Sequence, residues 1–470
     1  MLHRSLPPIG PKGKIYHWIA LSLVALLLTA CGSPPLATPQ AAHRIATPTS
    51  TLSRPMDTPT PPLTDTPEPT EPNPPTATAE PTEPRLPTAT LAPTTTPSST
   101  QGGEPNPTAT PQEATPNLPT PTATPTPRPR PPRMASPEYG MEAFLWWRPE
   151  VATRDLGLIE DAGFGWVKQD FAWRDIEGAG KGLFDWSRTD LIVKFAEDAG
   201  LDLLVRLDRP PAWTGAQSDG PSPHLADFGD FAYEIANRYR GRIRAYQIWN
   251  EPNLAREWGG RTPSAAEYVV LLKVAYQRLK SADPGAMVIS AGLSPTGSQP
   301  PEAIPDDLYL KQMYQAGASA YFDVLGLHAP GFKAPPEMSP EEVMANQEVY
   351  GHGRWFCFRH VEDLRQIMVQ YGDADKQVAV LEFGWTTDPR PDSPYNWHAV
   401  DEATQADYLV RAYQYAKGHW SPWIGLMCLI YISNPDWTPK DEQYWWAITW
   451  PGYPEPVLRP AYQALKAMPK

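Results

Sequence analysis

The distribution of prolines constrains this chain of 470 residues more than any other feature. About half of the 60 prolines fall in residues 31–133, roughly one fifth of the sequence, where Thr-Pro and Glu-Pro-Thr units repeat and large apolar residues are scarce. Such a segment cannot bury enough apolar surface to offset the entropy lost on folding. We therefore predict a disordered stalk at 31–133 and one folded domain at 134–470, a length that suits a large α/β domain.

The first 30 residues have the pattern of a signal peptide. Basic residues precede an apolar run from Trp18 to Leu28, which at roughly 11 residues is shorter than the ~20 that cross a bilayer as a helix. The run ends in Leu28-Thr29-Ala30-Cys31, which resembles the bacterial lipobox and so implies cleavage before Cys31 and lipidation of its thiol. We expect a lipid-anchored protein on the extracellular face of a bacterial membrane. An ordinary secretory signal, giving a secreted protein, is the alternative.

Charge and cysteine spacing exclude several classes of partner. The formal net charge of -13 and the absence of a basic stripe argue against nucleic acid, whose phosphates require clustered Lys and Arg, and favour a neutral substrate. Cys357 and Cys428 lack metal-ligand spacing and are interpreted as buried free thiols, with a disulfide between them left open. We expect no metal, no cofactor and a monomer.

After Met134, short apolar runs alternate with amphipathic stretches, which is the pattern of repeated βα units over a parallel sheet. Eight such units predict a closed (β/α)8 barrel. A doubly wound open sheet is the structural alternative, although no glycine-rich phosphate loop follows the first strand. The predicted strands are 139–145, 166–171, 201–207, 243–249, 287–291, 322–327, 377–381 and 424–432. The predicted helices are 185–199, 227–240, 264–282, 309–316, 359–371 and 402–417.

Two glutamates stand where predicted strands break into loops, at the end of a barrel that carries catalytic groups. Glu251 follows the fourth strand in Trp249-Asn250-Glu251-Pro252, and Glu382 ends the seventh in Leu381-Glu382-Phe383-Gly384. Strand alternation would place Val378, Val380 and Glu382 on one face, so valines filling the barrel interior would leave the glutamate at its mouth. Two carboxyl groups facing each other there suit cleavage of a glycosidic bond.

These two segments resemble the fourth- and seventh-strand motifs of glycoside hydrolase clan A, with families 5 and 39 nearest. The likeness extends over most of 134–470, including Trp166-Val167-Lys168 on the second strand, and covers no part of the stalk. It implies retention of configuration, with Glu251 as acid and base and Glu382 as nucleophile. The acid must carry a proton, so we expect burial and the charge of Glu382 to raise the pKa of Glu251.

The resemblance also implies supporting residues. Asn250 would bind the hydroxyl beside the anomeric carbon, and His328 would lie in the substrate pocket, although a purely structural role for each stays open. Pro330 stands where many relatives have a tyrosine, and Lys168 where they often have arginine. Lys168 and Arg206 would orient Glu382 or hold a sugar hydroxyl, with a barrel-filling ion pair as the alternative. Trp437 resembles the tryptophan that stacks on sugar in the clan.

Three functions remain open at this stage. The first is a retaining glycoside hydrolase that acts on a β-linked oligo- or polysaccharide outside the cell. The second is a catalytically inactive carbohydrate-binding lipoprotein on the same barrel, because a fold alone does not prove activity. The third is a stalked adhesion module. Glu251 and Glu382 together favour the hydrolase.

Overall fold

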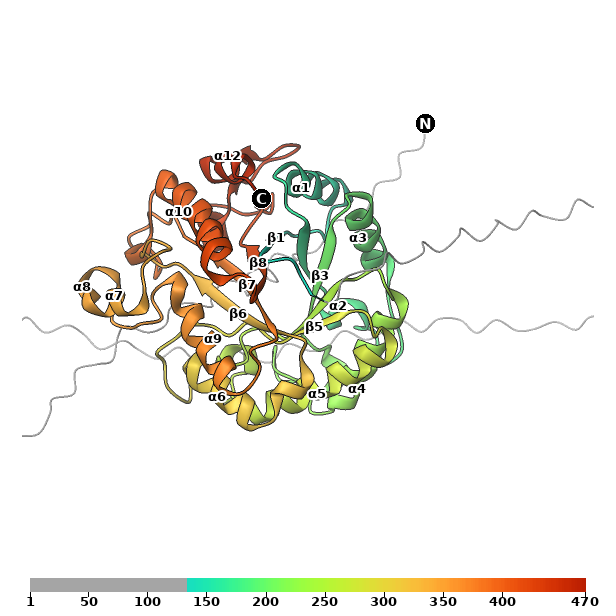
Figure 1. The fold of residues 1–470 in the computed structure, drawn as a ribbon. Helices are drawn as coiled ribbons and strands as arrows, with labels where there is room; N and C mark the ends of the chain where they lie inside the picture. The colour runs from blue at the N-terminus through green and yellow to red at the C-terminus, as the bar shows by residue number, and fades with distance from the viewer. Residues whose placement is uncertain (1–132) are drawn as a thin grey trace, which may run out of the picture. The chain divides into compact units, whose positions relative to one another are not determined.

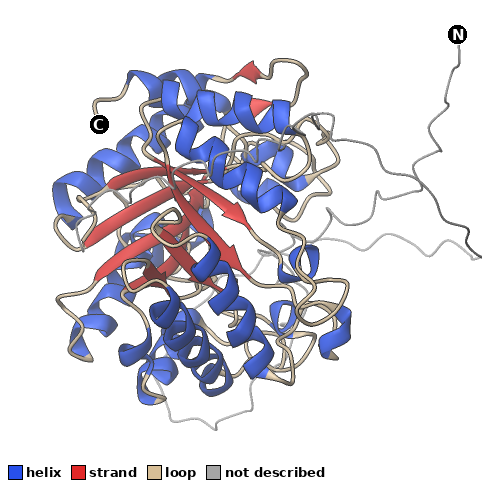
Figure 2. Cartoon of the chain, turned by 90° about the vertical axis from the view of Figure 1, so that its right-hand side faces the viewer, coloured by secondary structure: helices blue, strands red, loops and turns tan. Residues whose placement is uncertain are grey.

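The computed structural model describes residues 133–470, which form a closed barrel of eight parallel strands surrounded by helices (Figure 1, Figure 2). The strands pair in chain order, and Gly140 of the first strand pairs with both Trp166 of the second and Cys428 of the eighth. The sheet therefore has no free edge, which confirms the barrel and excludes the doubly wound alternative. The strands are β1 (Glu138–Glu142), β2 (Trp166–Asp170), β3 (Asp202–Leu207), β4 (Ala245–Ile248), β5 (Met287–Ile289), β6 (Val324–Pro330), β7 (Gln377–Gly384) and β8 (Ile424–Leu429).

Each of the eight predicted strands overlaps an observed one, and all six predicted helices are present. Two helices that cover the barrel were missed, α1 and α12. Helix α1 begins with Pro149 at its first turn and buries Ala152, Leu156 and Ile159, a spacing that does indicate a helix. The helices are α1 (Pro149–Asp161), α2 (Trp173–Ile176), α3 (Ser187–Asp198), α4 (Leu225–Arg238), α5 (Ala265–Ala282), α6 (Asp306–Gln315), α7 (Pro340–Ala345), α8 (Gln347–Tyr350), α9 (Val361–Gln370), α10 (Glu402–Tyr415), α11 (Glu442–Trp446) and α12 (Pro460–Ala467). A short hairpin of β9 (Thr449–Trp450) and β10 (Val457–Leu458) precedes α12.

The barrel interior is apolar at its N-terminal end and polar at its C-terminal end. Buried apolar side chains from β2 to β8, together with Met134, which precedes β1, form one interior cluster. It includes Leu204, Ala379 and Leu381. The next inward position toward the C-terminal end of β3 is Arg206. The change from apolar to charged residues along one face places the chemistry of the barrel at its mouth.

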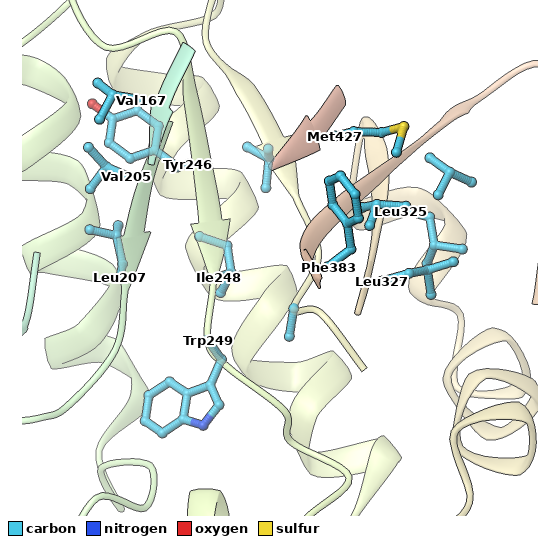
Figure 3. Packing of buried hydrophobic residues seen from close by; sticks show 14 of the residues in the cluster. Val167, Val205, Leu207, Tyr246, Ile248, Trp249, Leu325, Leu327, Phe383 and Met427 are labelled. Carbon is cyan, nitrogen blue, oxygen red and sulfur yellow. The ribbon is translucent and has the colours of Figure 1, made fainter. Parts of the chain in front are cut away.

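The outward faces of the strands pack against the helices in a second, larger cluster. Val205, Leu207 and Leu325 belong to it, as Figure 3 shows. Val378 and Val380 are also members, so the prediction that they fill the barrel interior is wrong.

Several expectations concern other parts of the chain or secondary features. Cys357 and Cys428 are both buried free thiols. None of the helices in residues 133–470 is long and apolar enough to cross a membrane. The predicted signal peptide at 1–30, the lipidation site Cys31 and the stalk, apart from residue 133, lie outside the described residues.

Candidate active site

Glu382 reaches the barrel interior because of a β-bulge in β7. Val380 pairs with Leu327 and Glu382 with His328, so Leu381 is an extra residue between two consecutive pairs of β6 and β7. The bulge lets Leu381 and Glu382 both face inward, whereas Val380 and Phe383 face the helices. Glu382 therefore stands at the mouth as predicted, although the simple alternation used to predict it does not hold.

Glu251 is placed by an unusual backbone at the end of β4. Trp249 has a φ of 72° and Glu251 has a φ of 36°. Both values lie in the left-handed region, which residues other than glycine rarely adopt. Hydrogen bonds hold this turn: Gln247 donates to the carbonyl of Trp249 at 3.0 Å, and the Glu251 amide donates to the carbonyl of Gly292 at 3.1 Å. Backbone strain maintained by its surroundings is typical of functional positions.

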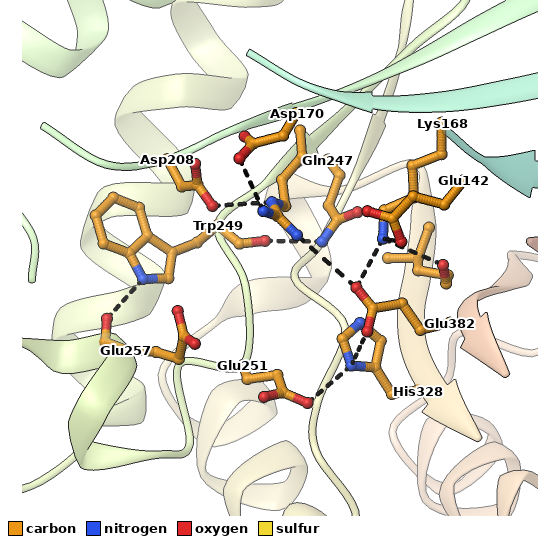
Figure 4. A network of polar contacts seen from close by, with 12 residues as sticks. Glu142, Lys168, Asp170, Asp208, Gln247, Trp249, Glu251, Glu257, His328 and Glu382 are labelled. Carbon is orange, nitrogen blue, oxygen red and sulfur yellow. Dashed lines mark hydrogen bonds and ion pairs between the residues drawn. The ribbon is translucent and has the colours of Figure 1, made fainter. Parts of the chain in front are cut away.

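Three cationic or histidine groups surround the carboxylate of Glu382 (Figure 4). Lys168 Nζ lies 2.8 Å from Oε1, Arg206 Nη1 lies 3.8 Å from the same oxygen, and His328 Nδ1 lies 3.7 Å from Oε2. Burial alone would raise the pKa of Glu382, but His328, Lys168 and Arg206 together lower it to about 2. Glu382 is thus held ionised at neutral pH, as a nucleophile requires.

Both oxygens of Glu251 are engaged. Oε1 lies 3.0 Å from His328 Nδ1, and Oε2 accepts a hydrogen bond from Arg256 Nη2 at 2.7 Å. Burial raises the pKa of Glu251, but His328 and Arg256 outweigh it and leave the pKa below its ordinary value. The expectation of a raised pKa is therefore wrong, because it included neither the hydrogen bond to His328, which is the larger of the two effects, nor the charge of Arg256.

His328 joins the two glutamates. Its Nδ1 atom is 3.0 Å from one carboxyl oxygen of Glu251 and 3.7 Å from one of Glu382. Those two oxygens are therefore within about 7 Å of each other, which is compatible with the roughly 5 to 5.5 Å between the carboxyl groups of retaining enzymes.

Lys168 and Arg206 are buried, so neither is available to a sugar hydroxyl. Lys168 also contacts Glu142 at 3.2 Å, and Arg206 contacts Asp170 at 3.0 Å. The two cations thus belong to an ion-pair network inside the barrel that also holds Glu382. Of the three roles considered for them, orientation of Glu382 and a barrel-filling ion pair both fit these contacts.

Four charged residues of this network were missed from the sequence: Glu142, Asp170, Asp208 and Arg209. Burial raises the pKa of Asp208 to about 7, whereas Arg206 and Arg209 counteract burial and hold the pKa of Asp170 at about 2. Asp170 and Arg206 are paired residues on neighbouring strands, and Glu142 pairs with Lys168. These four residues could have been predicted from the sequence, because each is a charged residue in or just after a predicted barrel strand.

Asn250 and Trp437 occupy different surroundings. Asn250 is 6% exposed, and its buried Oδ1 has no hydrogen-bond partner among the described residues. Trp437 is 8% exposed and packs edge-on against Phe144 and Tyr431, with ring centroids 4.8 and 5.5 Å apart. The Trp437 ring is therefore mostly covered by its aromatic neighbours.

A tyrosine that follows β8 lies near Glu382. Pro330 leaves β6 without the tyrosine that the resemblance implied, but Tyr431 is buried within electrostatic reach of Glu382. Burial first, and then the charges of Glu382 and Glu142, raise the pKa of Tyr431 well above its ordinary value. In residues 133–470 no group of three His, Cys, Asp or Glu side chains is arranged to hold a metal ion.

No protein-family model and no curated protein matches this chain. Its structure is similar to a family 39 glycoside hydrolase from Bacteroides cellulosilyticus WH2, with 19% identity and a TM-score of 0.53 over 72% of this chain and 64% of that one. It is also similar to a glucosidase from Croceicoccus marinus, with 12% identity and a TM-score of 0.51 over 71% and 66% of the two chains. A third similar structure is a monomeric β-xylosidase from Caulobacter crescentus CB15, with 16% identity and a TM-score of 0.50 over 71% of this chain and 69% of that one.

The chain spans just under two thirds of the length of the first two of these structures. At such low identity the likeness concerns the fold. Residues 133–470 thus form a (β/α)8 barrel of the kind found in glycoside hydrolases.

Proposed function

We propose that this protein is a retaining glycoside hydrolase that cleaves a β-linked saccharide through Glu251 and Glu382. One observation carries the proposal: the two carboxyl groups come from the ends of β4 and β7, share His328, and differ in their partners. Glu382 contacts the buried Lys168 yet keeps 15% of its side chain exposed. Substrate can therefore approach the carboxylate while the protein holds it from behind.

In the first step Glu251 donates a proton to the glycosidic oxygen while a carboxylate oxygen of Glu382 bonds to the anomeric carbon and the leaving group departs. In the second step Glu251 takes a proton from water, whose oxygen displaces Glu382 from the sugar. Lys168 and Arg206 stabilise ionised Glu382, so they favour its release in this second step. Both steps together retain the configuration of the anomeric carbon.

Loss of the Glu382 charge in the glycosyl-enzyme changes the acidity of Glu251. The charge of ionised Glu382 raises the pKa of Glu251. When Glu382 is esterified that charge disappears, so the pKa of Glu251 falls and the group becomes better suited to act as base. His328 contacts both carboxyl groups and fixes their relative position through this exchange.

We also propose that the protein acts on the extracellular face of a bacterial membrane. Support comes from the sequence: a signal-peptide pattern in residues 1–30, the lipobox-like cysteine Cys31, and the proline- and threonine-rich residues 31–133 as a spacer. A polysaccharide outside the cell would then be reached by a barrel held at a distance from the lipid surface.

The alternative is a carbohydrate-binding lipoprotein without activity, and one substitution separates the two. Glu382→Gln should lower kcat/KM for an activated aryl β-glycoside by at least about 10³-fold. Glu160→Gln, at an exposed position at the end of α1, should leave it unchanged. Wild-type protein that binds saccharides but turns over no glycoside in a broad panel would favour the binding protein instead.

A further inference from the structure

The contact between Arg256 and Glu251 conflicts with the acid role of Glu251. An acid needs one oxygen that carries a proton and faces the glycosidic bond, yet Arg256 binds Oε2 at 2.7 Å and His328 lies 3.0 Å from Oε1. The His328 side chain is 3% exposed, whereas that of Arg256 is 30% exposed on a short 3-10 helix, Ala255–Trp258. Arg256 is therefore the partner that can withdraw.

Its contact with Glu251 places Arg256 beside the proposed acid, and the acid stands next to the leaving group. His328, which contacts both glutamates, takes the oxygen of Glu251 that is oriented toward Glu382, and Arg256 takes the other oxygen. The sugar under attack must lie between the two carboxyl groups. The group that departs with the proton of Glu251 is then within reach of the Arg256 guanidinium.

The charged groups around Arg256 leave it dependent on Glu251. Glu257, on the same 3-10 helix, lies 3.7 Å from Arg256 Nε, and burial raises the pKa of Glu257 to about 8. Glu442 of α11, which Arg256 also influences, has a pKa raised well above its ordinary value by burial. Both carboxyl groups are thus mainly uncharged at neutral pH, so among the described residues Glu251 is the ionised carboxylate that pairs with Arg256.

Protonation of Glu251 would remove this counter-charge at the moment of catalysis. A carboxylate on the substrate would restore it, and guanidinium groups bind carboxylates through two parallel hydrogen bonds. Arg206 and Arg209 also lower the pKa of Glu257, but burial outweighs them and the pKa of Glu257 stays raised.

We propose that Arg256 binds a carboxylate on the leaving sugar, so that the preferred substrate carries a uronic acid on the leaving-group side of the scissile bond, in contrast to the neutral substrate that the net charge favours. This inference rests on the proposed glycosidase function. The uronate draws Arg256 from Oε2 of Glu251, and Glu251 takes up a proton from hydronium in the bulk solvent. Glu251 then donates this proton to the glycosidic oxygen as the bond to the sugar breaks. Binding of the correct leaving group thereby completes the acid.

The kinetic test compares two disaccharides that differ only in the leaving sugar, glucose in one and glucuronate in the other. Wild-type enzyme should show kcat/KM about tenfold higher for the glucuronate. Arg256→Gln should remove this preference, and Arg261→Gln should keep it, because Arg261 pairs with the exposed Glu267 in the first turn of α5 and not with Glu251. Equal kcat/KM for both disaccharides in the wild type would overturn the proposal.

A second readout separates a specific role of Arg256 from a structural one. On a neutral glycoside with a poor leaving group, Arg256→Gln should move the alkaline limb of the kcat/KM profile to higher pH, because loss of the cation raises the pKa of Glu251 and keeps it protonated to higher pH. A purely structural defect would lower kcat/KM without moving this limb, and such a result would contradict the proposal.

Binding measurements keep the inference testable if no glycoside is turned over. In the Glu382→Gln protein, tryptophan fluorescence titration should give about tenfold tighter binding of the glucuronate disaccharide, and Arg256→Gln added to it should abolish the difference. Selective binding without wild-type turnover would contradict the proposed hydrolase alone. Turnover without selectivity would contradict the role of Arg256 alone.

Discussion

Lys168 Nζ lies 2.8 Å from Glu382 Oε1, across the barrel interior from β2 to β7. Lys168 is completely buried, and its own pKa is raised because the charges of Glu142 and Glu382 outweigh the effect of burial. The ammonium group therefore stays charged across the working pH range. It is one of the main reasons that Glu382 is ionised despite its burial.

Replacement of Lys168 by methionine should raise the pKa of Glu382 from its value of about 2. Glu382 must be ionised to attack the sugar. The acidic limb of the kcat/KM profile should therefore lie at higher pH in Lys168→Met than in the wild type. We expect kcat/KM at neutral pH to fall by about 10²-fold. Lys168→Arg should restore part of the rate, and Lys194→Met on the exposed face of α3 serves as the control. An unchanged acidic limb in Lys168→Met would contradict this role.

Glu251→Gln should affect substrates according to the quality of their leaving groups. A poor leaving group needs the proton of Glu251, so its kcat/KM should fall by about 10³-fold, whereas a dinitrophenolate departs without a proton and should lose little in the first step. Added azide should then increase turnover and yield a glycosyl azide of retained configuration. Product analysis by NMR checks this, with Glu267→Gln as the control. An inverted azide, or equal losses for both leaving groups, would contradict the assignment.

The sequence was sufficient for the barrel and for its two glutamates because both depend on local pattern. Repeated apolar runs locate the strands, and a glutamate directly after such a run lies at the mouth of a parallel barrel whatever the details of packing. Glu382 shows the limit of this reasoning. The valines two and four residues before it face the helices, and a bulge at Leu381, which alternation does not predict, turns Glu382 inward.

The partners of these glutamates could not be predicted because they depend on contacts between loops and strands far apart in the sequence. Lys168 and Glu382 are 214 positions apart, and His328 meets Glu251 across 77. Arg256 is only five residues from Glu251, but the local sequence does not show that the two side chains meet. Their contact depends on the turn after β4, in which Trp249 and Glu251 have a left-handed backbone conformation. The pKa of Glu251 was predicted in the wrong direction for this reason.

His360 should stabilise the fold in a pH-dependent way. It is buried, with Nε2 3.0 Å from Asp306 at the start of α6 and Nδ1 2.9 Å from Asp363 in the first turn of α9. Burial lowers the pKa of His360, but the two aspartates outweigh it and raise the pKa to about 10. A raised pKa means that this stabilisation is complete below the unfolded value of about 6.5 and is lost as the pH rises through about 10.

His360→Gln should therefore lower the free energy of unfolding by about 3 kcal/mol at pH 6, because it leaves two carboxylates beside a buried neutral group. The difference from wild type should shrink as the pH approaches 10. Urea unfolding at several pH values measures this, with His419→Gln at an exposed position as the control. A difference that is constant over the whole pH range would show that His360 acts through packing and not through charge.

Cys31→Ala tests whether the protein is anchored through a lipid on this thiol. An acyl chain contributes about 0.8 kcal/mol per buried CH₂ group, so a protein carrying several chains should remain in the membrane fraction after washing with high salt. Cys31→Ala has no thiol to modify and should lose this association, whereas Cys357→Ala should not, because Cys357 is a buried thiol within the barrel domain. Fractionation of the producing cells, together with incorporation of labelled palmitate, gives the measurement. If the wild type is itself released and carries no label, the leader is an ordinary secretory signal, and the barrel works in solution instead of at the membrane surface.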